Sequence, residues 1–280
     1  MARQCWAVRP ARIHEGRGNV GIMATALITG GTSGIGYTFA EEFARRGTNL
    51  VLVARDSDRL STIAADFNQR YAIKVETISA DLSQRDDMER VADWIENVDN
   101  PIDWLINNAG FGLHSTVLDK SENDTHARAL DVMALAVLII GGAAGRRMRD
   151  QGHGRIVNVA SSASVIFTGN YSAVKAWCYN YSESLGQELH GTGVTVTALL
   201  PGWVKTEFHE RAGIKAHSLP DIVWIDAKQL VNECLRDAER GKPISVPALK
   251  WKIALIVAKF APKGFLRFFS RKLSASRKTK

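Results

Sequence analysis

The stretch Thr25–Gly36 constrains the fold more than any other part of the chain. Its apolar run Ala26–Ile28 predicts a buried strand, glycines follow at once, and residues 37–44 carry apolar side chains at helical spacing. A strand, a glycine turn and a helix together direct the N–H groups of the helix N-terminus toward a phosphate, and glycine lets the backbone approach a ligand closely. The stretch therefore predicts a dinucleotide cradle, with candidate binding residues Gly30, Thr32, Ser33, Gly34, Ile35 and Gly36.

A second glycine pattern, Gly16–Gly21, matches the general dinucleotide fingerprint G-x-G-x-x-G letter for letter. It follows no predicted strand and opens no predicted helix, so we do not assign it to the cofactor. The pattern in Thr29–Gly36 is T-G-x-x-x-G-x-G, and its strand-and-helix context supports the assignment. The predicted strand and helix around each glycine pattern, and not the match to the fingerprint, decide which of the two patterns is assigned to the cofactor.

Strands and helices are predicted to alternate through the first 200 residues. The expected strands are 26–28, 49–54, 74–80, 102–106, 155–159 and 194–200, and the expected helices are 37–44, 56–71, 83–98, 121–149 and 171–190. Near-continuous apolar strands indicate a parallel sheet covered on both faces. The predicted fold is α/β, a single doubly wound Rossmann-fold domain over residues 23–247. Residues 1–22 are expected to be a disordered extension, and the apolar run Ala134–Ile140 is too short to span a membrane.

Charge is distributed unevenly along the chain of 280 residues. The formal net charge is +7, yet residues 240–280 contain twelve Lys and Arg and no Asp or Glu, which leaves residues 1–239 with 24 basic and 29 acidic side chains. The basic, apolar segment 248–280 is predicted to be an amphipathic helical tail, with Lys252, Lys259 and Lys263 on one helical face. For this tail, a contact with a membrane, a lid over the site and a contact between subunits are all open. Nucleic-acid binding is not expected, because the body is acidic.

Cysteine and histidine usage argues against a metal or disulfide site. The three cysteines, Cys5, Cys178 and Cys234, are scattered, which favours a reducing compartment such as the cytoplasm. The histidines show no metal-ligand spacing; those considered are His114, His153, His190, His209 and His217. We therefore expect no metal.

Candidate residues for the adenosine end of a cofactor follow the second and third strands. Arg55 lies nineteen residues beyond Gly36, where an arginine accommodates a 2′-phosphate, so NADP(H) is favoured over NAD(H). The alternative is a solvated Arg55, with Asp56 on the ribose. Asp81, with Leu82 beside it, could accept from the adenine amino group or cap the helix near Ser83.

A tyrosine and a lysine one helical turn apart, Tyr171 and Lys175, suggest proton transfer. A free phenol has a pKa near ~10, and a nearby lysine and oxidised nicotinamide would lower it toward the working range. Ser161, just past the fifth predicted strand, could hydrogen-bond a carbonyl oxygen as charge develops there. Ser162 and Ser164 are alternatives for that role.

In combination these motifs resemble the short-chain dehydrogenase/reductase superfamily over roughly residues 24–208. The motifs are Thr29–Gly36, Asn107-Asn108-Ala109-Gly110, Ser161, Tyr171-x-x-x-Lys175 and Pro201-Gly202-x-x-x-Thr206. The resemblance implies that the serine polarises the carbonyl, the tyrosine transfers the proton and the lysine holds the nicotinamide ribose. By the same resemblance, the cofactor contacts would include Asn108, Ala109, Gly110, Tyr171, Lys175, Pro201, Gly202, Val204 and Thr206, with Asn107 supporting the sheet.

Two departures from the family pattern qualify the resemblance. Met133 stands where many relatives have an asparagine in the long helix, which predicts a slower proton relay because only the backbone carbonyl is retained. Ser161 precedes Tyr171 by ten residues, whereas many relatives have thirteen, so the connecting loop is shorter.

The sequence therefore predicts an NADP(H)-dependent enzyme that interconverts a carbonyl and a secondary alcohol on a hydrophobic substrate. Apolar residues beyond Pro201 suggest the substrate class; they are Trp203, Phe208, Leu219, Val223 and Trp224. Reduction of a 3-oxoacyl thioester is the rival reaction, and a catalytically silent nucleotide sensor or scaffold is the rival class. The resemblance implies a homodimer or homotetramer. We expect the protein in the cytoplasm, with a peripheral membrane contact if the tail makes one.

Overall fold

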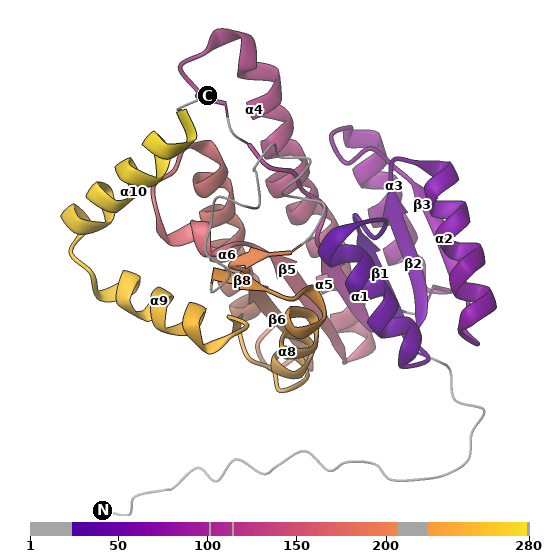
Figure 1. Ribbon diagram of the computed structural model, residues 1–280. Coiled ribbons are helices and arrows are strands. Elements are labelled where there is room, and N and C mark those ends of the chain that lie inside the picture. The colour runs from indigo at the N-terminus through magenta and orange to yellow at the C-terminus, as the bar shows by residue number, and fades with distance from the viewer. Residues whose placement is uncertain (1–23, 101, 114, 206–222, 279–280) are drawn as a thin grey trace, which may run out of the picture.

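The computed structural model describes residues 24–100, 102–113, 115–205 and 223–278 (Figure 1). The predicted extension 1–22 lies outside the described residues. The strands are β1 Thr25–Thr29, β2 Asn49–Ala54, β3 Val75–Ser79, β4 Trp104–Asn107, β5 Gly154–Val159, β6 Val194–Leu199, β7 Trp203–Val204, β8 Trp224–Ile225 and β9 Ile244–Ser245. The helices are α1 Gly34–Arg45, α2 Ser57–Arg70, α3 Arg85–Glu96, η1 Lys120–Glu122, α4 Asn123–Leu130, η2 Asp131–Leu135, α5 Ala136–Gln151, η3 Ser162–Val165, α6 Asn170–Glu188, α8 Ala227–Glu239, α9 Leu249–Phe260 and α10 Lys263–Lys278.

Seven parallel strands form the main sheet in the order β3-β2-β1-β4-β5-β6-β9. From β1 the chain first proceeds outward to β2 and β3, then crosses back to β4 on the other side of β1. Leu27 in β1 accordingly pairs with Val51 on one side and with Leu105 on the other. Ligands of open parallel sheets bind at the carboxyl ends of the strands where the order reverses, here those of β1 and β4. The predicted doubly wound parallel sheet is confirmed.

Side chains of the central strands alternate between two apolar cores, one on each face of the sheet. Ala26 and Ile28 face the core shared with α1, α2 and α8, whereas Leu27 faces the core shared with α3, α5 and α6. The helices therefore cover both faces, as Figure 1 shows, and the strands between them are buried almost completely.

The predicted elements match the observed ones closely up to residue 200. β2 coincides with the expected strand, and Asp56 caps α2 by accepting a hydrogen bond of 2.9 Å from the Arg59 N–H. The third helix begins at Arg85, later than expected, because Asp81 folds the preceding turn. Between Pro201 and the predicted helical tail, the structure contains four elements that were not predicted, β7, β8, α8 and β9.

The predicted helix 121–149 is interrupted by the π-helical turn η2, which separates α4 from α5. By length and composition, the whole helical stretch Lys120–Gln151 could cross a membrane, so the shortness of its central apolar run is not sufficient to exclude a span. Its buried residues, among them Ile140 and Ala143, pack against α3 and the sheet, with neither side chain exposed. We therefore assign it as a core helix.

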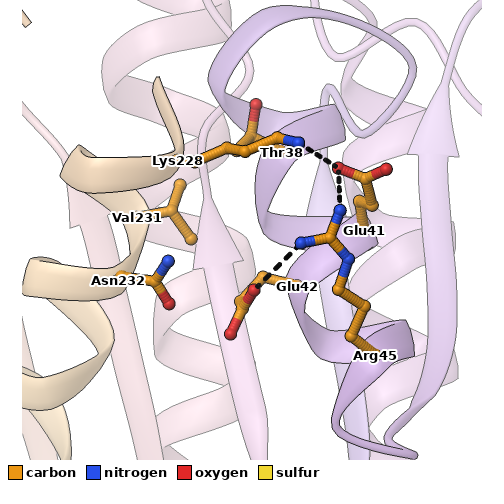
Figure 2. Close-up of a pocket in the computed structure, with 7 residues that line it drawn as sticks. All are labelled: Thr38, Glu41, Glu42, Arg45, Lys228, Val231 and Asn232. Atoms are coloured by element: carbon orange, nitrogen blue, oxygen red, sulfur yellow. Dashed lines mark ion pairs between the residues drawn. The ribbon is translucent and has the colours of Figure 1, made fainter. Parts of the chain in front are cut away.

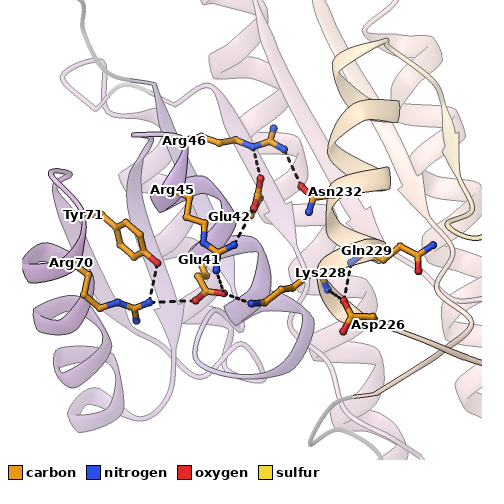
Figure 3. Close-up of polar contacts among 10 residues, drawn as sticks. All are labelled: Glu41, Glu42, Arg45, Arg46, Arg70, Tyr71, Asp226, Lys228, Gln229 and Asn232. Carbon is orange, nitrogen blue, oxygen red and sulfur yellow. Dashed lines mark hydrogen bonds and ion pairs between the residues drawn. The ribbon is translucent and has the colours of Figure 1, made fainter.

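Ion pairs join α8 to α1 at the edge of the domain. The Lys228 ammonium lies 3.9 Å from a Glu41 carboxylate oxygen, and Arg46 donates to Asn232 Oδ1 at 3.3 Å (Figure 3). Arg46 also donates to Glu239 at 2.8 Å. Figure 2 shows the small pocket lined by these two helices, which lies on the outer side of α1 and contains none of the predicted catalytic residues. The contacts are solvent-exposed, so each adds little stability. The buried side chains that the two helices share, such as Phe39 of α1 and Leu230 of α8, hold α8 against the first helix.

Helices α9 and α10, residues 249–278, form an arm outside the sheet and its helix layers (Figure 1). We call this segment the C-terminal arm. The prediction of a helical tail is correct, but the prediction of one basic face is wrong. α9 ends at Phe260, before Pro262, so Lys263 begins a separate helix, and Lys252 is half-buried near Glu233 and Asp237 of α8.

Candidate active site

The glycine turn between β1 and α1 requires glycine at the predicted positions. Gly30 and Gly34 have positive φ angles of 67° and 55°, which side-chain-bearing residues rarely adopt. A Cβ atom on Gly36 would overlap the Gly30 carbonyl oxygen and the Asn108 side chain. The backbone therefore folds back closely on itself, with Thr32 and Ser33 on the turn and Ile35 in the first turn of α1.

Asn108 fastens this turn to the end of β4. Its Nδ2 donates to the carbonyl oxygens of Thr29 and Gly30 at 3.0 and 3.2 Å, while its own N–H and that of Ala109 donate to Thr29 Oγ1 at 2.9 and 3.0 Å. The carboxyl ends of β1 and β4 are thereby locked together. The N-N-A-G segment thus shapes the predicted cradle.

The N-terminus of α1 fits a phosphate group. Ser33, at the N-cap, makes no side-chain cap hydrogen bond, and the first turn of the helix contains no acidic residue. The first N–H groups of a helix lack intrahelical partners and carry partial positive charge, which favours an anion. The donor set at this turn is therefore suited to the diphosphate of a dinucleotide.

Arg55 and Asp81 lie beyond β2 and β3, at the same edge of the sheet as the glycine turn. Arg55 is exposed, and its carbonyl oxygen accepts from Ser79 Oγ at 3.2 Å. Asp81 accepts from the N–H and hydroxyl of Ser83 at 3.0 and 2.9 Å and lies 3.6 Å from Arg128 of α4. Although partial burial opposes it, these hydrogen bonds and the nearby Arg128 and Arg55 hold the pKa of Asp81 below its usual range. Leu82 is buried and can contribute only backbone atoms to a ligand.

Ser161 follows the end of β5 and forms the N-cap of the short helix η3. Its hydroxyl oxygen accepts from the Ala163 N–H at 3.1 Å, which leaves the hydroxyl proton able to donate. Of the two alternatives, the Ser164 hydroxyl donates to the Ser161 carbonyl, and the Ser162 N–H donates to the Pro201 carbonyl at 2.8 Å. The latter bond joins the serine loop to the Pro-Gly loop.

Tyr171 and Lys175 lie one turn apart at the start of α6, against which η3 packs. The Lys175 ammonium lies 6.0 Å from the centre of the Tyr171 ring and donates to the Val159 carbonyl oxygen at 2.8 Å. Burial of Lys175 lowers the pKa of its ammonium group. The fold thus joins Lys175 to the end of β5, two residues before Ser161, and packs the helix that Ser161 caps against the helix that carries Tyr171.

A buried chain of polar side chains fixes α6 to the sheet. Asn107 Nδ2 donates to Asn158 Oδ1 at 2.9 Å, and Asn158 Nδ2 donates to Ser182 Oγ at 3.0 Å. Ser182 in turn donates to the Cys178 carbonyl at 2.7 Å. Asn107 has the sheet-supporting position that the sequence predicted. Asn158 and Ser182 were not predicted, and their local sequence gives no sign that they meet.

Met133 lies in the π-helical turn and is buried in a small apolar cluster beside the site. Its sulfur would be 3.1 Å from a Cβ atom added to Gly110, and the cluster includes Val174 and Tyr171 of α6. Met133 therefore packs between the N-N-A-G segment and the tyrosine helix. Its side chain offers only a weakly accepting thioether, so a polar contact here depends on the backbone.

The Pro-Gly loop lies beneath the C-terminal arm. Pro201 and Val204 are buried, and a Cβ atom on Gly202 would overlap the Trp251 ring of α9. Of the predicted apolar mouth, Trp203 and Trp224 pack edge to face with ring centres 5.9 Å apart in the β7–β8 ladder. Val223 accepts from the Trp251 indole at 3.2 Å. Thr206, Phe208 and Leu219 lie outside the described residues.

His126 of α4 is a further residue that the sequence reasoning missed. It is buried, with Nδ1 3.3 Å from Asn170 Nδ2 and Nε2 3.4 Å from Ser115 Oγ. Asn170 directly precedes Tyr171, so His126 links the start of the tyrosine helix to the loop after β4. A lone histidine on a predicted helix gives no sequence signal for such a contact.

Within the described ranges, no group of three or more His, Cys, Asp or Glu side chains could hold a metal ion. His153 lies near Asp103 at 3.7 Å on the surface, and His190 ends the turn after α6. His114, His209 and His217 lie outside the described residues, as does Cys5. Cys178 and Cys234 are free and buried, and burial raises the pKa of both thiols.

The family model described as "short chain dehydrogenase" matches residues 24–216. The chain belongs to the short-chain dehydrogenase family. Members are oxidoreductases that act on CH–OH and C=O groups with a nicotinamide cofactor, and this chain is such an oxidoreductase. The superfamily resemblance drawn from its motifs is confirmed. Family members generally act on small substrates and form oligomers.

Solved structures and curated proteins that are similar to this chain also include dehydrogenases and reductases. A short-chain dehydrogenase from Sphingobium yanoikuyae in complex with NADPH is 35% identical, with a TM-score of 0.76, over 87% of this chain and 94% of that one. A bulky-bulky ketone specific alcohol dehydrogenase from Comamonas testosteroni is 31% identical, with a TM-score of 0.73, over 87% and 93%. The 3-oxoacyl-[acyl-carrier-protein] reductase of Aquifex aeolicus is 30% identical over 65% of this chain and 74% of that protein.

Proposed function

We propose that the protein is an NADP(H)-dependent oxidoreductase that interconverts a carbonyl and a secondary alcohol on a hydrophobic substrate. The observation that carries this proposal is the placement of Tyr171 and Lys175 one turn apart on α6, with Ser161 at the N-cap of η3, which packs against α6. These side chains lie beyond the carboxyl ends of the strands, where the glycine turn forms its cradle.

Each of these side chains has one role in the proposed reaction. The cofactor, held by the glycine turn and the N-N-A-G segment, supplies the hydride. In the direction of reduction, the Tyr171 hydroxyl gives its proton to the carbonyl oxygen, and the Ser161 hydroxyl donates a hydrogen bond to the same oxygen as negative charge develops there. Lys175 holds the cofactor ribose and stabilises the phenolate that Tyr171 leaves behind.

The preference for NADP(H) over NAD(H) is supported by Arg55. Its exposed position at the end of β2 suits a guanidinium that pairs with a 2′-phosphate. The alternative in which Asp56 binds a ribose is weakened, because the Asp56 carboxylate caps α2. Similarity to a structure in complex with NADPH agrees with this preference.

A hydrophobic substrate is supported by apolar side chains on the loops around the site. Val117 and Leu118 follow β4 with 58% and 89% of their surface exposed, and Phe167 precedes Tyr171 with 53% exposed. Exposed apolar groups that flank catalytic residues favour an apolar ligand. Similarity to the ketone-specific dehydrogenase favours a bulky ketone, whereas similarity to 3-oxoacyl reductases keeps an acyl thioester as the second candidate.

We further propose that the enzyme acts in the cytoplasm as a homodimer or homotetramer. Two residues on the outer side of the helices after the cradle support self-association: Leu138 of α5 and Trp177 of α6 are 45% and 37% exposed. Sedimentation velocity of the full chain measures the oligomer directly. A monomer at every concentration would contradict this part of the proposal.

The function is tested by following NADPH oxidation against a panel of ketones, aldehydes and 3-oxoacyl thioesters. We expect the fastest turnover with bulky apolar ketones. Faster turnover of 3-oxoacyl thioesters would select the second candidate instead. Turnover of no member, with NADPH bound tightly, would favour a catalytically silent nucleotide-binding protein.

A further inference from the structure

We propose that the C-terminal arm, residues 249–278, is a docking surface for a membrane with anionic lipids. α9 has two apolar faces. The inner face packs against the body through Trp251 and Leu255, but the outer face also carries large apolar side chains. Its exposed residues, with 54–79% of their surface accessible, are Leu249, Ile253, Ile256, Val257 and Phe260.

The spacing of these residues shows that they form one stripe. Side chains three and four positions apart share a face of a helix, and the five positions follow that spacing along all of α9. A helix on the surface of a soluble protein ordinarily turns polar residues outward. A continuous exposed apolar stripe therefore indicates a surface that is covered when the protein is in its working environment.

α10 adds positive charge beside exposed aromatic rings. Lys263, Arg267 and Arg271 are exposed and four residues apart, so they lie on one face, and Phe265 and Phe268 are each 57% exposed on another. Apolar residues that enter the acyl boundary, with basic residues beside them for the headgroups, are typical of helices that lie in a membrane interface.

The charge distribution selects an anionic bilayer over a second copy of the chain as the partner. The arm contains nine Lys and Arg and no acidic residue, so two arms facing one another would repel. Residues 1–239 are net acidic, so the positive charge that attracts anionic lipids is concentrated in the C-terminal segment that contains the arm, and it would orient the molecule.

The arm is fixed to the body at two loops of the candidate site. Trp251 lies against Gly202, and the buried Ser270 hydroxyl of α10 accepts from the Phe167 N–H at 3.0 Å, in the loop between Ser161 and Tyr171. A membrane bound to the outer side of the arm would thus lie next to the loops that border the site. The arm can therefore be both a lid and a membrane contact. Its inner side lies against the loops of the site, and its outer side would bind the membrane.

The test is flotation of the purified full chain with vesicles of phosphatidylcholine alone and of phosphatidylcholine mixed with phosphatidylglycerol. We expect the protein to float only with the anionic vesicles and to be released by added salt. Failure to float with either vesicle at low salt overturns the proposal. Equal flotation with both vesicles overturns the requirement for anionic lipid.

Matched variants locate the surface. Ile256→Glu places a charge in the apolar stripe, and its control Val98→Glu alters an exposed apolar residue after α3. Arg267→Glu reverses a charge of α10, and its control Arg149→Glu reverses one at the end of α5. We expect both arm variants to lose most of the vesicle-bound fraction while both controls float like the wild type.

Melting curves and NADPH oxidation establish that each variant is folded.

Sedimentation velocity without lipid then tests whether a second copy of the chain, instead of a membrane, covers the stripe. If Ile256→Glu dissociates an oligomer that Val98→Glu preserves, and flotation is unchanged, the stripe is a subunit interface and the proposal is wrong. Flotation of Ile256→Glu equal to that of Val98→Glu likewise contradicts it.

Discussion

The Lys175 ammonium donates a hydrogen bond of 2.8 Å to the backbone carbonyl oxygen of Val159, at the end of β5. This bond holds the lysine at the carboxyl edge of the sheet, one turn from Tyr171, and places a buried cation where the fold offers few other charges. Burial lowers the pKa of Lys175, so the position of this group affects the pH dependence of the free energy of unfolding as well as catalysis.

Replacing Lys175 with methionine should change how stability depends on pH. Between its lowered pKa and the ordinary lysine value, the folded protein binds fewer protons at Lys175 than the unfolded chain, so wild-type stability rises with pH in that window. Lys175→Met removes this dependence. The free energy of unfolding of the variant should exceed that of the wild type by the largest amount below the lowered pKa of Lys175. This difference should shrink as the pH rises through the window.

Urea unfolding of cofactor-free protein at neutral and alkaline pH measures this difference. Lys74→Met, which alters an exposed lysine, is the control and should show no such trend. A free-energy difference between Lys175→Met and wild type that stays constant across the window would show that the ammonium is not buried in solution.

An alanine at position 36 should abolish cofactor binding. Its Cβ would overlap the Gly30 carbonyl oxygen and the Asn108 side chain, so the turn must open and misalign the N-terminus of α1. Overpacking of this kind costs about 1–3 kcal/mol of stability. Titration of intrinsic fluorescence with NADPH checks binding, and urea unfolding checks stability.

Gly186 of α6 provides the matched control, because the nearest atom to an added Cβ is Val196 Cβ at 3.7 Å. Gly186→Ala should retain cofactor binding and add up to about 1 kcal/mol of stability, since alanine favours a helix. Wild-type NADPH affinity in Gly36→Ala would be incompatible with the turn described above.

Ser182→Ala should destabilise the protein by about 1–3 kcal/mol, because it leaves Asn158 Nδ2 buried without its acceptor. Ser184→Ala removes the same hydroxyl from the exposed side of α6, where it donates to the Asn180 carbonyl, and should change stability by less than about 0.5 kcal/mol. Urea unfolding compares the two variants. Equal effects would mean that the Asn107–Asn158–Ser182 chain does not anchor α6.

Arg55→Ala should weaken NADPH binding and leave NADH binding unchanged. Hydrogen bonds to a charged group contribute about 1.5–3 kcal/mol, which corresponds to roughly a 10- to 150-fold increase in the NADPH dissociation constant. Arg85→Ala, at the start of α3, is the control. A parallel loss of NADH affinity in Arg55→Ala would rule out recognition of a 2′-phosphate by this residue.

Local sequence patterns were enough for six of the seven strands of the main sheet and for the glycine turn. Their determinants lie close together in the chain, as in the strand 49–54 and the cap at Asp56. Contacts between distant segments could not be predicted. The contact between Trp251 and Gly202 joins residues 49 positions apart, and the hydrogen bond from the Phe167 N–H to the Ser270 hydroxyl joins residues 103 positions apart.

The single basic face proposed for the tail failed for a related reason. Helical spacing was projected across Ala261 and Pro262, where the structure turns into a second helix. Proline lacks the N–H that would continue the first helix, so the register is lost at this point. The short strands β7, β8 and β9 contain two residues each, too few to give a periodic signal.

The central claim is that the Tyr171 hydroxyl transfers the proton, and the turnover number of Tyr171→Phe with NADPH and the best ketone of the panel tests it most directly. We predict a decrease of about 10²- to 10⁴-fold, with NADPH affinity and melting temperature close to those of wild type. Tyr179→Phe, on the same helix, should retain full activity. Wild-type turnover by Tyr171→Phe would contradict the account.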